Sequence, residues 1–197
     1  MDSRKELVDC VKSLYGMGLT TPVSGNHSIR SGGSLMWITP SGVPRYRMRP
    51  ADLVRVDLKT GKAIGRSKPS IELGMHRSIY NVRPDINAIV HVHSPFTIGV
   101  SISAKRFWHV IGEAKMVVGE PAVITNRPSG SAELAKAVSD EFKKGARAVV
   151  IKNHGVVAGG SDIDHARAIV ESLEEWAKIL TIAQVFGGVS SWLDDDG

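Results

Sequence analysis

The sequence predicts an α/β fold in which a mixed, largely antiparallel β-sheet is covered by helices on both faces. Short polar turns separate some of the β-rich segments, which favours antiparallel pairing, whereas helical segments lie between others and allow parallel pairing. The 197 residues contain no repeat, low-complexity stretch or evident linker. We therefore expect one domain over residues 1–197.

The N-terminal part is predicted to form a helix followed by two strands. Apolar residues recur on one helical face between about residues 4 and 16. Residues 26–30 and 35–39 read as strands joined through a Ser-Gly-Gly turn. A tight Pro-Ser-Gly turn follows at residues 40–42.

A second helix is expected to run from an N-cap at Ser70 to about residue 82. Ile71, Met75 and Ile79 are spaced four apart, which predicts that all three lie on its buried face. The β-rich segment at residues 87–93 comes next, followed by a proline, Pro95, that suits the first position of a helix.

The C-terminal part is predicted to contain two helices around a hairpin. Ser129 or Ser131 could cap a helix that ends near residue 143. Two apolar strands, at residues 148–152 and 156–158, flank an Asn-His-Gly hairpin tip. Asp162 then caps a long amphipathic helix.

The composition limits the classes of partner. No apolar run approaches the roughly 18–20 residues that cross a bilayer, and the charged start lacks a secretory signal, so we expect no membrane partner. Cys10 is the only cysteine, which excludes an internal disulfide and predicts a cytoplasmic location. The basic residues behind the net charge of +5 are scattered and only 6% of residues are aromatic, so we expect no nucleic-acid partner. The charge also suits a small anion.

Three histidines are the main candidates for chemistry. His91 and His93 lie two apart in a predicted strand, so both imidazoles can reach one ion, although such a pair is also compatible with two ordinary histidines. His154 at the hairpin tip is either a turn residue tolerant of unusual backbone angles or a third ligand. Three histidines around an open fourth position form a known catalytic zinc arrangement.

Acidic and small polar residues complete the candidate site. Glu72 lies in a first helical turn, where the helix dipole favours a carboxylate in any protein, but a carboxylate beside a metal ion also suits acid–base catalysis. The helix start at Ser70 and the turns at residues 24–26 and 40–42 could bind an anion, or be ordinary loops.

In order along the chain, these motifs resemble the class II aldolase/adducin-head family, most closely its L-fuculose-1-phosphate aldolase branch. The matching motifs are Ser-Gly-Asn at 24–26, Thr-Pro-Ser-Gly at 39–42, Lys-Pro-Ser-x-Glu at 68–72, Arg-Pro-Asp at 83–85, His-x-His at 91–93 and Asn-His-Gly at 153–155. The resemblance implies a three-layer α/β/α sandwich with Zn²⁺ bound by three histidines. It also implies homotetramers with active sites at subunit interfaces.

The resemblance carries roles to individual residues. It implies that His91, His93 and His154 bind the zinc, and that Glu72 is the catalytic acid–base, which takes the fourth metal position when substrate is absent. The residues that match the family's phosphate-binding segments are Asn26, Ser41, Gly42, Ser70 and Ile71, the last through its backbone N–H because the family's second serine is replaced here. The tyrosine that fuculose-phosphate enzymes contribute to a neighbour's site is also missing, and Glu113 is the candidate replacement.

These roles predict a zinc-dependent aldolase that cleaves a ketose 1-phosphate to dihydroxyacetone phosphate and an aldehyde through a metal-bound enediolate. Other enediolate reactions on the same fold remain alternatives, namely a pentulose-phosphate 4-epimerase, a methylthioribulose-phosphate dehydratase and a sugar-acid phosphate decarboxylase. A non-catalytic adducin-like interaction module is a further alternative, although such modules lack the zinc histidines.

Two other features have open interpretations. His76 lies one helical turn after Glu72 and could be an alternative ligand, a solvated residue or a partner of the ligands. The cluster of Arg45, Arg47 and Arg49 could be a solvated charged face, or could steer an anionic substrate.

Overall fold

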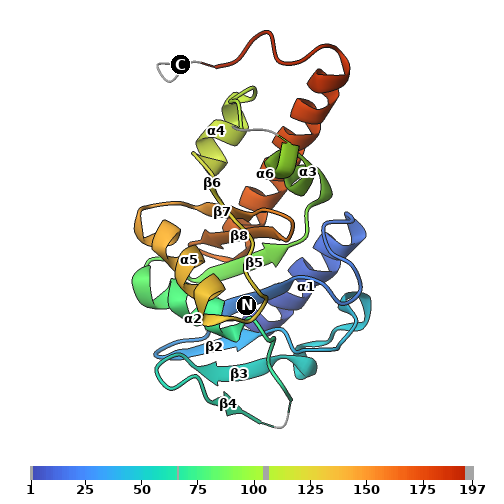
Figure 1. Cartoon of the computed structure of the whole chain (residues 1–197). Helices are drawn as coiled ribbons and strands as arrows, with labels where there is room; N and C mark the ends of the chain where they lie inside the picture. The colour runs from blue at the N-terminus through green and yellow to red at the C-terminus, as the bar shows by residue number, and fades with distance from the viewer. Residues whose placement is uncertain (1, 66, 104–106, 194–197) are drawn as a thin grey trace.

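A single β-sheet lies between the helices of the molecule. The computed structural model describes residues 2–65, 67–103 and 107–193. Within them, eight strands form one sheet in the order β4-β3-β2-β1-β5-β8-β7-β6 (Figure 1). The strands are β1 (Asn26–Arg30), β2 (Leu35–Ile38), β3 (Val54–Asp57), β4 (Ala63–Ile64), β5 (Ala88–Val92), β6 (Ala122–Ile124), β7 (Ala148–Ile151) and β8 (Gly155–Gly160). Neighbouring strands are antiparallel except β6 and β7, so the mixed, largely antiparallel sheet is confirmed.

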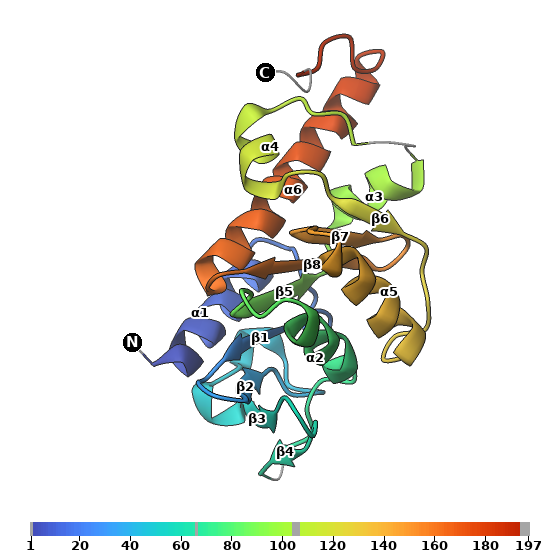
Figure 2. The ribbon, with the colours of Figure 1, turned by 90° about the vertical axis from the view of Figure 1, so that its left-hand side faces the viewer.

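Helices cover both faces of this sheet (Figure 2). They are α1 (Ser3–Gly16), α2 (Leu73–Val82), α3 (Pro95–Ser103), α4 (Gly112–Val118), α5 (Ala132–Lys143) and α6 (Ile163–Val185). Helices α2 and α5 pack together on one face, whereas α1 and α6 lie on the other, where α6 also contacts α3 and α4. The three-layer α/β/α fold is therefore confirmed.

Two buried apolar clusters, one on each face of the sheet, join the layers. Along β5, Ala88, Val90 and Val92 belong to the cluster under α1 and α6, whereas Ile89 belongs to the cluster under α2 and α5. Burial of each large apolar side chain stabilises the fold by roughly 1.5–3 kcal/mol. Because side chains alternate along a strand, His91 lies on the same face as Ile89, beneath α2.

The predicted N-caps are confirmed for α5 and α6 but not for α2, and the cap of α1, Asp2, was not predicted. Side-chain oxygens of Asp2, Ser131 and Asp162 each accept a backbone N–H in the first turn of α1, α5 and α6. Of the two predicted caps for α5, Ser131 is the one used, and Pro95 opens α3 as expected. Among the described residues, no helix combines the length and hydropathy that a membrane crossing requires.

The exception is α2, which begins later than predicted. Its N-cap is Glu72, and the Ser70 hydroxyl instead accepts the Glu72 backbone N–H at 3.2 Å in a separate turn before the helix. Met75 and Ile79 are buried as predicted, but Ile71 is 69% exposed. The prediction for Ile71 was wrong because this residue precedes the helix and is not part of its apolar face.

The strand order brings three distant segments to one edge of the sheet. Strand β5 lies between β1 and β8, so that His91 is opposite Asn26 on one side and Val157 on the other. The turn between β7 and β8 therefore lies beside the end of β5 and the start of β1. The candidate site forms at this edge.

Candidate metal centre and anion pocket

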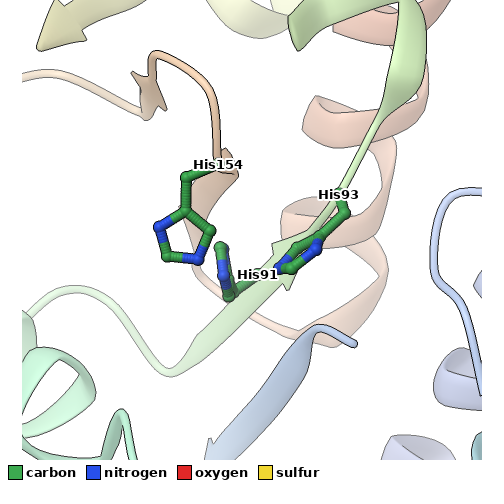
Figure 3. A group of neighbouring side chains, drawn as sticks. All are labelled: His91, His93 and His154. Atoms are coloured by element: carbon green, nitrogen blue, oxygen red, sulfur yellow. The ribbon is translucent and has the colours of Figure 1, made fainter. Parts of the chain in front are cut away.

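The three candidate histidines converge at this edge of the sheet (Figure 3). His91 is in β5, His93 follows its last residue, and His154 is in the turn before β8. One ring nitrogen from each lies within 4.8 Å of the others, and the ring centroids are 5.0–5.2 Å apart. His91 is fully buried, and the other two are half-buried. The cluster could therefore hold a metal ion.

The backbone of the hairpin tip explains why His154 reaches the other two. Asn153 has a φ of 60°, a left-handed conformation that asparagine tolerates better than most residues. A Cβ atom on Gly155 would collide with the Val92 carbonyl oxygen and lie 3.0 Å from the His91 ring. Only glycine allows β8 to pack so closely against β5, which carries the turn toward the other histidines.

The hydrogen bond of the His91 ring leaves its Nε2 lone pair available for a cation. Its Nδ1 lies 2.9 Å from the Val156 carbonyl oxygen, which can only accept, so Nδ1 carries the proton. In the neutral ring, Nε2 then has a free lone pair, 3.1 Å from Oε2 of Glu72. His91 Nε2 and Glu72 Oε1 are buried without a hydrogen-bond partner. Two facing acceptors repel each other unless a cation or a shared proton lies between them, so these residues fit a metal ion.

Glu72 joins the histidines to α2. Its side chain is 3% exposed, and Oε1 lies 3.6 Å from His154 Nε2. Burial raises the pKa of the Glu72 carboxyl, but its electrostatic interaction with the neighbouring His91 and a hydrogen bond from Asn26 lower it, and the net pKa is below its usual value. Glu72 is therefore ionised at neutral pH, as a metal-adjacent base must be.

Burial also keeps the other two histidines neutral. Burial and the neighbouring His91 lower the pKa of His93 to about 4, and the same two causes lower the pKa of His154. Neutral imidazole is the form that binds metals.

A pocket of about 200 Å³ opens directly beside this cluster. The residues predicted to bind phosphate all line it, namely Asn26, Ser41, Gly42, Ser70 and Ile71, and so do Glu72 and His93. The loops are tied together because the Ser41 N–H bonds the Lys68 carbonyl at 3.1 Å and the Ser70 N–H bonds the Thr39 carbonyl at 3.1 Å. The structure thus joins the predicted anion segments to the predicted catalytic carboxylate.

Arg45 is a residue whose position the sequence did not reveal. Its side chain is 3% exposed and donates to the carbonyl oxygens of Gly25 at 2.6 Å, Ser24 at 3.1 Å and Val43 at 3.2 Å. The interpretation as part of a solvated face is therefore wrong for Arg45, because loop carbonyls replace water around it. Arg45 thereby holds two loops of the anion pocket together. Ser129 is a further residue that lines the pocket and that the site prediction did not include.

Two other predicted residues lie elsewhere. Glu113 is exposed at the start of α4 and does not line the anion pocket of its own chain, so its proposed role rests on a neighbouring chain. His76 is fully buried, which excludes the solvated interpretation, and its two ring nitrogens contact Asn26 and Ser28 instead of the histidine cluster.

Comparison with known proteins places this geometry in a family. The sequence profile described as Class II Aldolase and Adducin N-terminal domain matches residues 5–181. The chain belongs to this family. It is similar to an L-fuculose phosphate aldolase of Methanococcus maripaludis, with 37% identity over 88% of this chain and 93% of that protein. The predicted family and enzyme class, a class II aldolase and therefore a lyase, are thereby confirmed.

Two further members of the class II aldolase family show how far the likeness extends. A 3-oxo-tetronate 4-phosphate decarboxylase of Haemophilus influenzae is 33% identical over 92% of this chain and 89% of its own length. The crystal structure of an L-fuculose-1-phosphate aldolase from Thermus thermophilus superposes with a TM-score of 0.84, at 28% identity, over 96% of this chain and 97% of that one. The family thus includes proteins named for different reactions.

Proposed function

We propose that this protein is a zinc-dependent aldolase that cleaves a ketose 1-phosphate, of the L-fuculose 1-phosphate type, into dihydroxyacetone phosphate and an aldehyde. One observation carries the proposal: Glu72 is buried between a three-histidine cluster and a pocket suited to an anion. The relatives named as phosphate aldolases support the substrate class.

The pocket would hold the substrate by its phosphate. The backbone N–H groups of Gly42 and Ile71 and the hydroxyl of Ser70, which accepts from the Glu72 N–H and keeps its own hydrogen, are donors that suit phosphate oxygens. The N–H groups of Ser41 and Ser70 and the Ser41 hydroxyl instead donate to carbonyl oxygens and fix the shape of the pocket. Fixing one end of the substrate places its reacting carbon near Glu72, and such positioning lowers the barrier by several kcal/mol.

Glu72 would transfer the proton. In cleavage it delivers a proton to the carbon that loses the aldehyde, and in synthesis it removes that proton. A divalent cation bound by His91, His93 and His154, with Glu72 beside it, would act as a Lewis acid that stabilises negative charge on the substrate oxygens. Three imidazoles with an open position favour Zn²⁺.

The remaining parts of the proposal concern the assembly and the cell. We propose a homotetramer in which Glu113 of a neighbouring chain serves the aldehyde oxygen, because Glu113 is exposed and lies outside the pocket of its own chain. A cytoplasmic location remains a prediction, supported by the single, buried and unpaired Cys10.

A Glu72→Gln variant tests the role of Glu72. It keeps the shape of the side chain and a possible oxygen ligand but cannot accept a proton. We expect cleavage of ketose 1-phosphates to fall by about 10²–10⁴-fold with the zinc content unchanged. Near-normal cleavage in this variant would remove Glu72 from its role.

Decarboxylation of a phosphorylated keto acid is a second candidate. One observation favours it: a relative at 33% identity is named as such a decarboxylase. Product analysis separates the two. The first proposal predicts release of dihydroxyacetone phosphate from a panel of ketose 1-phosphates, whereas release of CO₂ from 3-oxo acid phosphates alone would overturn it in favour of the second.

A further inference from the structure

A line of buried polar side chains runs from Glu72 into the core between β1 and α2. Alternate side chains of β1 face the helix, and side chains four residues apart on α2 face the strand. The polar side chains of the two elements therefore lie in one line. The contacts are Asn26 Nδ2 to Glu72 Oε2 at 3.0 Å, Asn26 Oδ1 to His76 Nε2 at 2.6 Å, His76 Nδ1 to Ser28 Oγ at 2.7 Å and Ser28 Oγ to Tyr80 Oη at 2.9 Å. His76, Ser28 and Tyr80 are 0–2% exposed.

The chemistry of each atom fixes the direction of every bond in this line. The Glu72 carboxylate only accepts, so Asn26 presents its NH₂ group to Glu72 and its oxygen to His76. That oxygen only accepts, so His76 carries its proton on Nε2. Burial lowers the pKa of His76 to about 3, so the ring is neutral and its Nδ1 accepts from the Ser28 hydroxyl. Because the Ser28 hydrogen is used in this way, Ser28 accepts from Tyr80 at 2.9 Å, and the Tyr80 hydroxyl also has a longer contact of 3.4 Å with the Asn87 carbonyl oxygen. From Tyr80 to Asn26, each donor in the line thus points toward Glu72.

We propose that His76 is a positioning residue whose Nε2–H locks the Asn26 amide with its NH₂ group toward Glu72 and the anion pocket. Asn26 has two amide hydrogens, of which one bonds Glu72 and the other is free to face the pocket that Asn26 lines. One locked amide thus orients the carboxylate and binds the anion. The part of this proposal that concerns the anion rests on the proposed function, whereas the locked amide does not.

The reverse orientation of the amide shows why a lock matters. It would place the Asn26 oxygen 3.0 Å from Glu72 Oε2, where two acceptors repel. It would also turn an oxygen toward the anion and an NH₂ group toward His76. Glu72 and His76 select the same orientation from opposite ends of the amide, so loss of the donor on His76 Nε2 leaves Glu72 alone to hold it.

The tautomer of His76 tests the lock without any substrate. In the ¹⁵N spectrum of the zinc-loaded protein, we expect the resonance pair that disappears in His76→Gln to show a protonated Nε2 and an unprotonated Nδ1 at neutral pH. A protonated Nδ1 with a bare Nε2, or a doubly protonated ring, would overturn the proposal even if the protein is an aldolase.

Three variants test the effect on the site. His76→Leu removes the donor, His76→Gln restores an N–H near Nε2, and Ile79→Val weakens packing on the same helix without touching the polar line. We expect His76→Leu to weaken binding of inorganic phosphate about tenfold and to lower kcat by a similar factor, and the Gln variant to recover most of both. Zinc content should stay unchanged.

Two results of these measurements would contradict the lock. Equal losses in His76→Leu and His76→Gln would show that the N–H does not matter, and an equal loss in Ile79→Val would indicate packing alone. If the wild-type protein cleaves no ketose phosphate, the proposed function fails, while phosphate binding and the ¹⁵N spectrum still decide the role of His76.

Discussion

The histidine cluster and the anion pocket are neighbours, but they are built by different means. The cluster consists of side chains at strand ends, where His91 is fully buried and held by the Val156 carbonyl. The pocket consists of loop backbone and small side chains, and its rim includes the 69% exposed Ile71. Glu72 belongs to both regions.

This difference indicates which part of the site can change between relatives. A metal ion needs lone pairs in fixed directions, so the cluster depends on strand register and buried partners. Backbone N–H groups bind an anion whatever side chain they carry, so we expect anion binding to persist with Ile71 at the position where the resemblance implies a serine. We therefore expect relatives named for aldol cleavage and for decarboxylation to share the metal centre and to differ in the pocket.

The largest predicted effect is at the histidine cluster. We expect His91→Ala to lose most of its bound zinc and at least about 10³-fold in turnover, because the cation supplies several kcal/mol of charge stabilisation. Metal analysis and product assays measure both. His165→Ala, at the start of α6, is the control, and equal zinc content in both variants would contradict the assignment of His91.

The next largest effect is expected at Arg45, which holds two loops of the anion pocket together. In Arg45→Met, the carbonyl oxygens of Gly25, Ser24 and Val43 lose their donor, so we expect the free energy of unfolding to fall by about 3 kcal/mol. The KM for phosphorylated substrate should rise more than kcat falls. Denaturant titration and kinetics check this, with the exposed Arg47→Met as control; matching stabilities would show that Arg45 braces nothing.

A smaller effect concerns the pH dependence of stability. The pKa of His76 is lowered from 6.5 to about 3, so below pH 6.5 the unfolded chain binds a proton that the folded chain does not. Stability is therefore lost as the pH falls from 6.5 toward 3, and at pH 5 the loss due to His76 is about 2 kcal/mol. Urea titrations at pH 7.5 and pH 5 should show a correspondingly smaller loss for His76→Gln than for the wild type. Parallel losses would contradict the burial of a neutral His76.

The smallest effect is expected at Ile71, on the rim of the anion pocket. Ile71→Ser adds a hydroxyl to the pocket, and we expect phosphate binding to tighten by less than about tenfold, with stability nearly unchanged because Ile71 is exposed. Calorimetric titration with inorganic phosphate measures this. The matched control is Ile64→Ser on β4, outside the pocket, and a gain in both variants or in neither would contradict the placement of Ile71.

The sequence predicted most of what local chemistry determines. Strand alternation placed His91 and His93 on one face, and turn and cap residues such as Asp162 marked the ends of elements. The resemblance supplied the remaining roles. These predictions succeeded because each depends on residues a few positions apart.

What the sequence did not predict depends on contacts between distant segments. The strands β4 and β6 and the helix α4 have too few residues for a periodic pattern, whereas the alternating Val-Arg-Val-Asp of β3 was a signal that the prediction missed. The sequence of an arginine cluster does not show whether a side chain is exposed to water or, like that of Arg45, is buried against loop carbonyl oxygens. The late start of α2 arises from the turn at Ser70, and the role of Glu113 depends on a second chain, so it stays a prediction.

The most direct test of the account is anomalous diffraction at the zinc absorption edge from crystals grown with Zn²⁺. The account predicts one strong peak per chain, bounded by rings of His91, His93 and His154 and adjacent to the Glu72 carboxylate. A peak elsewhere, or none between those rings while zinc is abundant, would contradict it.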